Sequence, residues 1–167
     1  MENSQAAVVE NSQVAEKNES TAGGSQDPVS ATLDNIPVYS GTPYVVIDDN
    51  EPDFTEDELT DQSYESYSDL DELGRCGVAA SNIGTDLMPT GERGKIGQVK
   101  PSGWQTIKFD NVDGKYLYNR CHLIGYQLTA ENANEKNLIT GTRYMNVDGM
   151  LPFEIWLPTT SKRQIIM

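Results

Sequence analysis

The pattern of apolar and polar positions divides the chain near residue 36. Residues 1–35 are rich in Ser, Gln, Asn, Glu and Ala, contain no aromatic side chain and have few long aliphatic ones. Such a segment cannot bury enough apolar surface to offset the entropy that it loses on ordering. We therefore expect a disordered tail over residues 1–35 and one folded domain over residues 36–167.

Three patterns follow in the first part of this domain. Residues 36–47 alternate β-branched and aromatic side chains and contain two prolines, which predicts extended chain. Residues 57–72 alternate acidic side chains with tyrosines, a weak surface-helix pattern. Gly and Pro separate short apolar pieces in residues 75–98, so we expect loops there, with one short strand.

The clearest local signal is a β-hairpin. Residues 104–109 alternate at period two, residues 110–114 have turn composition, and residues 115–119 alternate again. Gly114 suits a positive φ within the turn. The second strand runs directly into His122, which places this side chain at a strand end.

The segments after His122 are shorter. Residues 129–136 have the composition of an exposed loop or a frayed helical turn, and residues 147–149 resemble a turn. Residues 150–154 resemble a helix start, with Pro152 in the first turn, where its missing N–H costs little. Together the elements predict an α+β fold with a mainly antiparallel sheet.

The charge is divided unevenly along the chain. The net charge of −14 is unfavourable for a protein that binds polyanions, but residues 1–74 hold 18 carboxylates and one lysine, a charge of −17. Residues 75–167 hold 8 carboxylates and 11 cations, a charge of +3, which suits phosphate contacts. We expect the acidic run of residues 48–72 to be a solvated surface; a calcium site or a mimic of nucleic acid is the alternative.

Two cysteines, Cys76 and Cys121, permit one disulfide or two free thiols. No apolar stretch near Met1 is long enough for a signal peptide, and no run approaches the length of a membrane span.

The candidate chemistry centres on His122, the only histidine in the chain. An imidazole can take a proton from water near neutral pH, although a lone histidine is more often structural. Arg120 lies two residues earlier on the same strand face, Asn146 follows 24 residues later, and Glu154 comes 8 residues after Asn146, about two helical turns. The structural alternatives are a helix cap for Asn146, a solvent-facing helix residue for Glu154, and surface ion pairs for Arg120 and Arg143.

These residue types fit phosphodiester hydrolysis. The reaction needs a base for water, a cation for the charge that develops on phosphate and leaving oxygen, and a clamp for the phosphate. Magnesium keeps most of its waters, so one Asn carbonyl and a water-linked carboxylate can hold it.

At these positions the chain resembles a known family. Residues 119–122, Asn-Arg-Cys-His, are similar to the Asp-Arg-Gly-His signature of the DNA/RNA non-specific endonucleases, which have a ββα-metal active site. Residues 118–128, 137–146 and 150–154 resemble the branch with the nucleases of bacterial DNA uptake and the streptococcal secreted DNases. The resemblance covers roughly residues 36–154.

The resemblance implies a role for each residue. His122 would be the general base, Asn146 the direct ligand of Mg²⁺ or Mn²⁺, and Glu154 a catalytic group held to the metal through water. Arg120, grouped with the catalytic residues, and Arg143 would contact phosphate. The family further implies DNA, with RNA as a second candidate substrate, 5′-phosphate products, and an extracellular or cell-surface location.

Two departures from the family stand out. Asn119 and Cys121 replace the Asp and Gly of the signature, and Asn lacks the charge that would raise the basicity of the imidazole. Relatives continue past the glutamate with a longer helix, whereas Pro158 would interrupt one here. Back-translation of residues 155–167 with one inserted base gives Asn-Met-Val-Ala-Asp-Tyr-Ile-Lys-Glu-Thr-Asn-Asn-His, a helical pattern close to the family's continuation. We therefore hypothesise a frameshift that truncates the nuclease domain.

Other functions stay open at this stage. An inactive remnant that only binds nucleic acid is one alternative, and an antibacterial nuclease toxin domain with an inhibitor or immunity protein is another. The residues leave the oligomeric state and the preference between DNA and RNA open.

Overall fold

The computed structural model describes residues 36–47 and 54–156, and the backbone of residues 163–166. The predicted tail and part of the acidic run, residues 48–53, lie outside the described residues, as do residues 157–162 and Met167. The frameshift hypothesis therefore stays a prediction about the nucleotide sequence.

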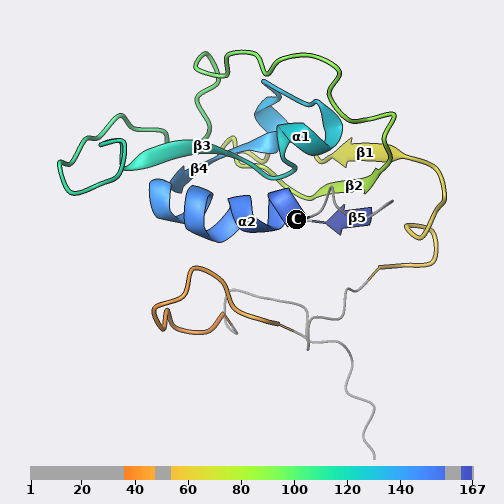
Figure 1. Cartoon of the computed structure of the whole chain (residues 1–167), viewed down its shortest axis with the longest axis horizontal. Helices are drawn as coiled ribbons and strands as arrows, with labels where there is room; N and C mark the ends of the chain where they lie inside the picture. Colours follow the sequence, from red (N-terminus) through yellow and green to blue (C-terminus); the bar gives the residue numbers. More distant parts are fainter. Residues whose placement is uncertain (1–35, 48–53, 157–162, 167) are drawn as a thin grey trace, which may run out of the picture.

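The strands form two small antiparallel sheets (Figure 1). One has the order β1-β2-β5, from strands β1 (Tyr64–Tyr67), β2 (Ala79–Ile83) and β5 (Arg163–Ile166). The other pairs β3 (Tyr118–His122) with β4 (Leu138–Thr142), in a register that sets His122 opposite Leu138.

Short helices connect and cover these strands. Helix α1 (Tyr126–Thr129) follows β3, and the 3-10 turn η2 (Glu135–Asn137) leads into β4. A π-helical segment η3 (Met145–Met150) continues into α2 (Leu151–Trp156), and Figure 1 shows α2 running beside the β3–β4 pair. This arrangement confirms the predicted α+β class with antiparallel sheets. In the described part of the chain, no helix is long and apolar enough to cross a membrane.

The core lies between β2 and the chain that follows β3. Its fully buried members are Ala79, Ile83, Ile124 and Leu128. Tyr67, Met88 and Leu123 pack against them. Burial of each large aliphatic side chain contributes about 1.5–3 kcal/mol, so this cluster ties the segment after His122 to the larger sheet.

A buried amide fixes the same segment in place. Asn137 accepts a hydrogen bond from the Ile124 N–H (2.8 Å) and donates one to the Ile124 carbonyl (3.0 Å). The Leu123 N–H donates to the Asn137 carbonyl at 2.9 Å. Because Asn137 is fully buried, losing these bonds would leave polar groups unsatisfied. The backbone on the C-terminal side of His122 is therefore held firmly.

The predicted hairpin is confirmed in its turn and second strand. The Phe109 N–H donates to the Lys115 carbonyl (2.9 Å), and the Leu117 N–H donates to the Ile107 carbonyl (3.0 Å). Gly114 has a φ of 66°, as its turn position predicts. The prediction of a first strand over residues 104–109 is wrong in extent, because only an isolated bridge between Lys108 and Tyr116 forms there. Strand β3 pairs instead along its whole length with β4.

Two other predictions are wrong. Residues 57–72 form no surface helix but contain β1, which pairs with β2. Residues 147–149 are not a turn but part of η3, where Gly149 is buried. A Cβ on Gly149 would lie 3.4 Å from the Pro43 carbonyl oxygen, an ordinary van der Waals contact, so Pro43 packs directly against η3. The short strand within residues 75–98 is confirmed. The helix start predicted at residues 150–154 is wrong in place, because η3 runs directly into α2 and Pro152 lies within this longer helical run.

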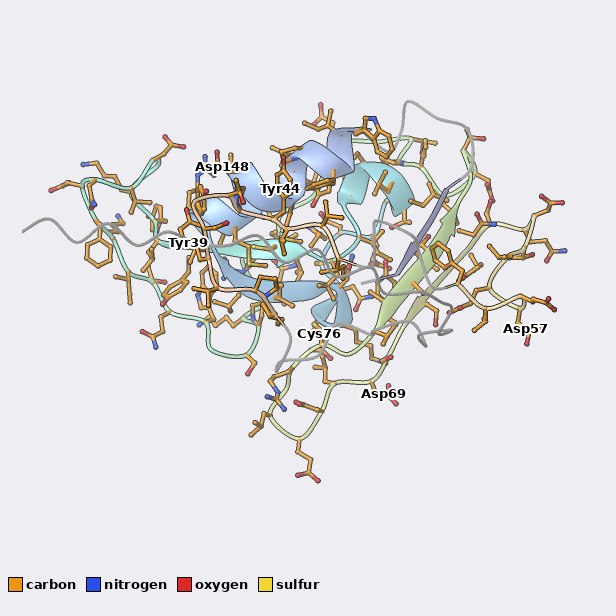
Figure 2. The ribbon with its side chains drawn as sticks, turned by 90° about the horizontal axis from the view of Figure 1, so that it is seen from below. Tyr39, Tyr44, Asp57, Asp69, Cys76 and Asp148 are labelled. Carbon is orange, nitrogen blue, oxygen red and sulfur yellow. The ribbon has the colours of Figure 1, made fainter. Side chains whose placement is uncertain are left out.

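Residues 36–47, here called the N-terminal strap, have no regular secondary structure and lie against the helical run. Tyr44 packs edge-to-face on Phe153 of α2, with ring centroids 5.0 Å apart. The hydroxyl groups of Tyr39 and Tyr144 are 3.4 Å apart. Figure 2 shows Tyr39, Tyr44 and Asp148 gathered on one side of the molecule, away from Asp57 and Asp69. Extended chain was predicted here; the structure gives this segment no strand and a bend at residues 41–43.

Both cysteines are free thiols. Cys121 is fully buried on β3, and Cys76 donates to the carbonyl oxygens of Glu135 and Leu138 at 3.3 and 3.4 Å. Of the two alternatives left open by the sequence, two free thiols is therefore the correct one.

Candidate functional site

The imidazole of His122 lies at the end of β3 and is 5% exposed. Its Nε2 atom is 2.8 Å from the carbonyl oxygen of Asn132, and its Nδ1 atom is 3.1 Å from an Nη atom of Arg93. A guanidinium can only donate, so Nδ1 accepts its hydrogen bond. The ring proton is then on Nε2, which donates to the Asn132 carbonyl. The ring is therefore neutral, with its lone pair on Nδ1.

The surroundings of the ring favour this neutral form. Burial lowers the pKa of His122, the hydrogen bond to the Asn132 carbonyl raises it, and the positive charge of Arg93 lowers it. A neutral imidazole at lower pH is the state that a general base needs. The carbonyl of Asn132, rather than the side chain of Asn119, fixes the tautomer.

Glu154 lies on α2 and is half-buried. Burial raises the pKa of its carboxyl group, while a hydrogen bond from Gln127 and the charge of Arg93 lower it. The Gln127 amide donates to Oε2 at 3.0 Å. A Cβ on Gly125 would lie 2.8 Å from the same oxygen, so a glycine leaves room for the carboxylate. Glu154 is thus not a solvent-facing helix residue.

A pocket of about 620 Å³, here called the hairpin pocket, contains the other three predicted residues. Its lining includes Trp104, Tyr116, Tyr118, Arg120, Arg143 and Asn146. Arg120 and His122 project from the same face of β3, because side chains two residues apart in a strand point the same way. Strand β3 therefore links the hairpin pocket to the His122 site.

Arg120 is largely committed to protein contacts. Its guanidinium donates to the Val99 carbonyl and, at 2.9 Å, to the Gly97 carbonyl. It also lies over the Trp104 ring, 3.7 Å from the centroid. These contacts clamp the loop of residues 97–104 onto β3. The predicted phosphate contact of Arg120 would use its remaining N–H groups and stays a prediction.

Arg143 is less fully engaged. One Nη atom pairs with Asp113 of the hairpin turn at 2.8 Å, and Asp113 is highly exposed. Its Nε atom is buried and, among the described residues, has no hydrogen-bond partner. A buried N–H without an acceptor costs roughly 1–3 kcal/mol, which an anionic ligand would relieve. The structure thus shows the surface ion pair that was the alternative, and an unused donor beside it.

Asn146 is the second residue of η3 and does not cap it. The N-cap is Tyr144, with no side-chain cap hydrogen bond, and Thr142 accepts from the Met145 N–H at 3.0 Å. Within the described part of the chain, the amide of Asn146 makes no hydrogen bond and faces the hairpin pocket. The cap interpretation is therefore wrong.

The oxygen atoms of Asn146 and Glu154 are the kind of ligand that suits a hard cation that keeps most of its waters. In the described ranges, no group of three or more His, Cys, Asp or Glu side chains could hold a metal ion. A site built on one amide oxygen and a water-linked carboxylate needs no such group. The unengaged amide of Asn146 fits the direct ligand of such a site, and the half-buried carboxylate of Glu154 fits the water-linked group.

The structure thus forms two groups from the five predicted residues. Arg120, Arg143 and Asn146 line the hairpin pocket, while His122 and Glu154 are linked through Arg93. Sequence reasoning missed Arg93, Gln127 and the Asn132 carbonyl. The only available signal for Arg93 was a basic residue between two glycines of a loop, since loops often carry functional groups.

Comparisons with known proteins bear on the family and the fold of the chain. A search of curated proteins finds no match to the chain. Among solved structures, NucA from Streptococcus agalactiae with a magnesium ion bound aligns with a TM-score of 0.58 and 17% identity, over 68% of this chain and 56% of NucA. The metal-free form of NucA gives the same TM-score and identity over 76% of this chain and 63% of NucA.

A third structure, the Sda1 nuclease with a bound zinc ion, is 28% identical over 57% of this chain and 54% of its own, with a TM-score of 0.47. The chain spans about three fifths of the length of NucA, and the likeness to NucA shows a shared fold. The sequence model of the DNA/RNA non-specific endonucleases matches residues 55–163, and this chain belongs to that family.

Proposed function

We propose that the protein is a divalent-metal-dependent endonuclease that hydrolyses phosphodiester bonds of DNA without sequence preference, with RNA as a second candidate substrate. One observation supports this most strongly. The only histidine of the chain is held neutral, with its basic Nδ1 atom beside the guanidinium of an arginine. General bases and phosphate clamps need this combination.

The first step falls to His122. Its Nδ1 lone pair takes a proton from the attacking water, while Nε2 keeps its own proton and donates it in a hydrogen bond to the Asn132 carbonyl. Arg93 must leave Nδ1 before the ring can accept a proton, because two N–H groups cannot face each other there. An incoming phosphate gives the guanidinium a stronger partner, so substrate binding would free the base.

Asn146 and Glu154 supply the cation site. Asn146 would hold magnesium through its amide oxygen, and Glu154 would hold one of the metal's waters; manganese would fit the same donors. Bound there, the ion supplies positive charge for the phosphate and leaving oxygen. The structures of magnesium-bound and metal-free NucA, with which this fold is shared, support a divalent ion as cofactor.

The absence of sequence preference follows from the kind of contact. Arg93, Arg120 and Arg143 would bind phosphate, and phosphate contacts carry no direct sequence information. The 5′-phosphate products implied by the family require that water attack phosphorus and expel the 3′ oxygen.

A plasmid assay tests the proposal. We expect the 167-residue chain to nick supercoiled DNA in Mg²⁺ or Mn²⁺, to be silent in EDTA, and to leave ends that accept label from a kinase only after phosphatase treatment. Binding of DNA without cleavage in either metal would show an inactive nucleic-acid-binding remnant instead.

A further inference from the structure

The hairpin pocket contains more than phosphate-binding groups. Three aromatic side chains, Trp104, Tyr116 and Tyr118, share its lining with Asn146. Tyr116 is 46% exposed although the Lys108 ammonium lies 4.6 Å from its ring centroid. A polar ligand contact or a metal ion has no need of such rings. They are the groups on which nucleobases stack in single-stranded nucleic-acid sites.

The cationic side chains of the pocket suit the phosphate group of a nucleotide. Lys100, Arg120 and Arg143 line it together with the rings, and the Nε atom of Arg143 is buried without a partner in the described part of the protein. Aromatic rings and cations in one lining suit a strand in which each base is followed by a phosphate. The amide of Asn119 and the hydroxyl of Thr106, also in the lining, can bond to base edges.

The size of the pocket and the cost of taking a base out of a duplex together favour an unpaired base. About 620 Å³ falls within the roughly 300–1,000 Å³ that hold one small-molecule-sized group. A base in a duplex has both faces covered by its neighbours, and taking it out costs a few kcal/mol. An unpaired base enters without that cost.

We propose that the hairpin pocket binds one unpaired nucleobase of the substrate strand, next to the phosphate that is cut. The proposal rests on the proposed function, because Asn146 joins the base to the cation site. It assigns the enzyme a preference for single-stranded or locally melted DNA. Stacking is tolerant of sequence, so this preference is compatible with non-specific cleavage.

The test measures binding without cleavage. A fluorescein-labelled oligothymidylate is titrated with the protein in EDTA at one fixed ionic strength, because phosphate contacts depend on salt. Two matched probes accompany it: a strand of equal length with abasic sites in place of the bases, and a blunt duplex. We expect the oligothymidylate to bind at least about fivefold more tightly than the abasic strand, since stacking on one ring contributes roughly a 5- to 150-fold change in affinity.

Tyr116→Leu should remove most of this difference, and Tyr116→Phe should keep it. Phe109→Leu is the matched control, because Phe109 is 48% exposed on the same hairpin and does not line the pocket. Equal affinity of the parent for normal and abasic strands would overturn the proposal, as would equal losses in Tyr116→Leu and Phe109→Leu. If the parent still nicks plasmid in magnesium, only the base pocket is wrong; if it neither nicks nor binds, the proposed function fails as well.

Discussion

An Nη atom of Arg93 lies 3.1 Å from Nδ1 of His122. The contact joins a loop arginine to the end of β3, 29 residues later in the chain. It occupies the Nδ1 atom that we propose takes a proton from water, and its charge lowers the pKa of the ring. In the proposed mechanism, His122 accepts a proton only after an anion draws Arg93 away.

Arg93→Gln should move the acid limb of the pH–rate profile to higher pH. A general base works only when neutral, so a lowered pKa keeps it active at lower pH; removing the Arg93 charge removes one cause of that lowering. Arg93→Lys keeps the charge and should keep the limb in place. The measurement is kcat/KM for nicking as a function of pH at fixed magnesium. A limb in Arg93→Gln that coincides with the parent's would show that Arg93 does not act on His122.

Asn146→Ala should raise the magnesium concentration that gives half-maximal activity. The substitution removes the one protein oxygen proposed to bind the metal directly. Asn134→Ala is the control, since the Asn134 side chain accepts from the Lys136 N–H at 2.9 Å and caps η2. That variant should lose about 0.5–2 kcal/mol of stability with no change in the metal midpoint. An unchanged midpoint in Asn146→Ala would end its role as a ligand.

Gly125→Ala should reduce activity with little loss of stability. Its new methyl group would lie 2.8 Å from Glu154 Oε2 and 2.7 Å from Gln127 Nε2, and both are ends of side chains that can swing away. A misplacement of about 1 Å can cost roughly 10²-fold in rate. Gly91→Ala, where nothing lies within 4 Å, should leave rate and melting temperature unchanged. Parental activity in Gly125→Ala would mean that the position of Glu154 is unimportant.

Tyr44→Ala should loosen the helical run that carries Asn146 and Glu154. Its edge-to-face contact with Phe153 contributes about 0.5–1.5 kcal/mol beyond the buried area. Thermal unfolding should show a lower melting temperature, and nicking should slow in parallel. Val38→Ala serves as the control because Val38 is 91% exposed. Equal melting temperatures of the two variants would show that the N-terminal strap does not support the helix.

Sequence reasoning predicted what local chemistry determines. The turn at Gly114 and the placement of His122 at a strand end both follow from neighbouring residues. Residues 57–72 were misread because β1 exists through its pairing with β2, which no local period reveals. The acidic run accordingly contains one strand of the larger sheet.

The residues of the candidate site also differ in whether the sequence could reveal them. His122, Asn146 and Glu154 could be found from motifs, because their spacing along β3 and the helical run is local. Arg93 reaches His122, and Gln127 reaches Glu154, only through the folded chain. Gly149 resembled a turn residue, but it lies within η3, in contact with Pro43. Long-range contacts of this kind leave no periodic signal.

The rate of plasmid nicking by His122→Ala tests the central claim most directly. It should be measured with saturating magnesium, alongside DNA affinity in EDTA, with His122→Gln as a variant that retains a donor for the Asn132 carbonyl. We expect both variants to bind DNA as the parent does and to cleave about 10²- to 10⁴-fold more slowly. Cleavage at the parental rate by a folded His122→Ala protein would contradict the assignment of His122 as the general base.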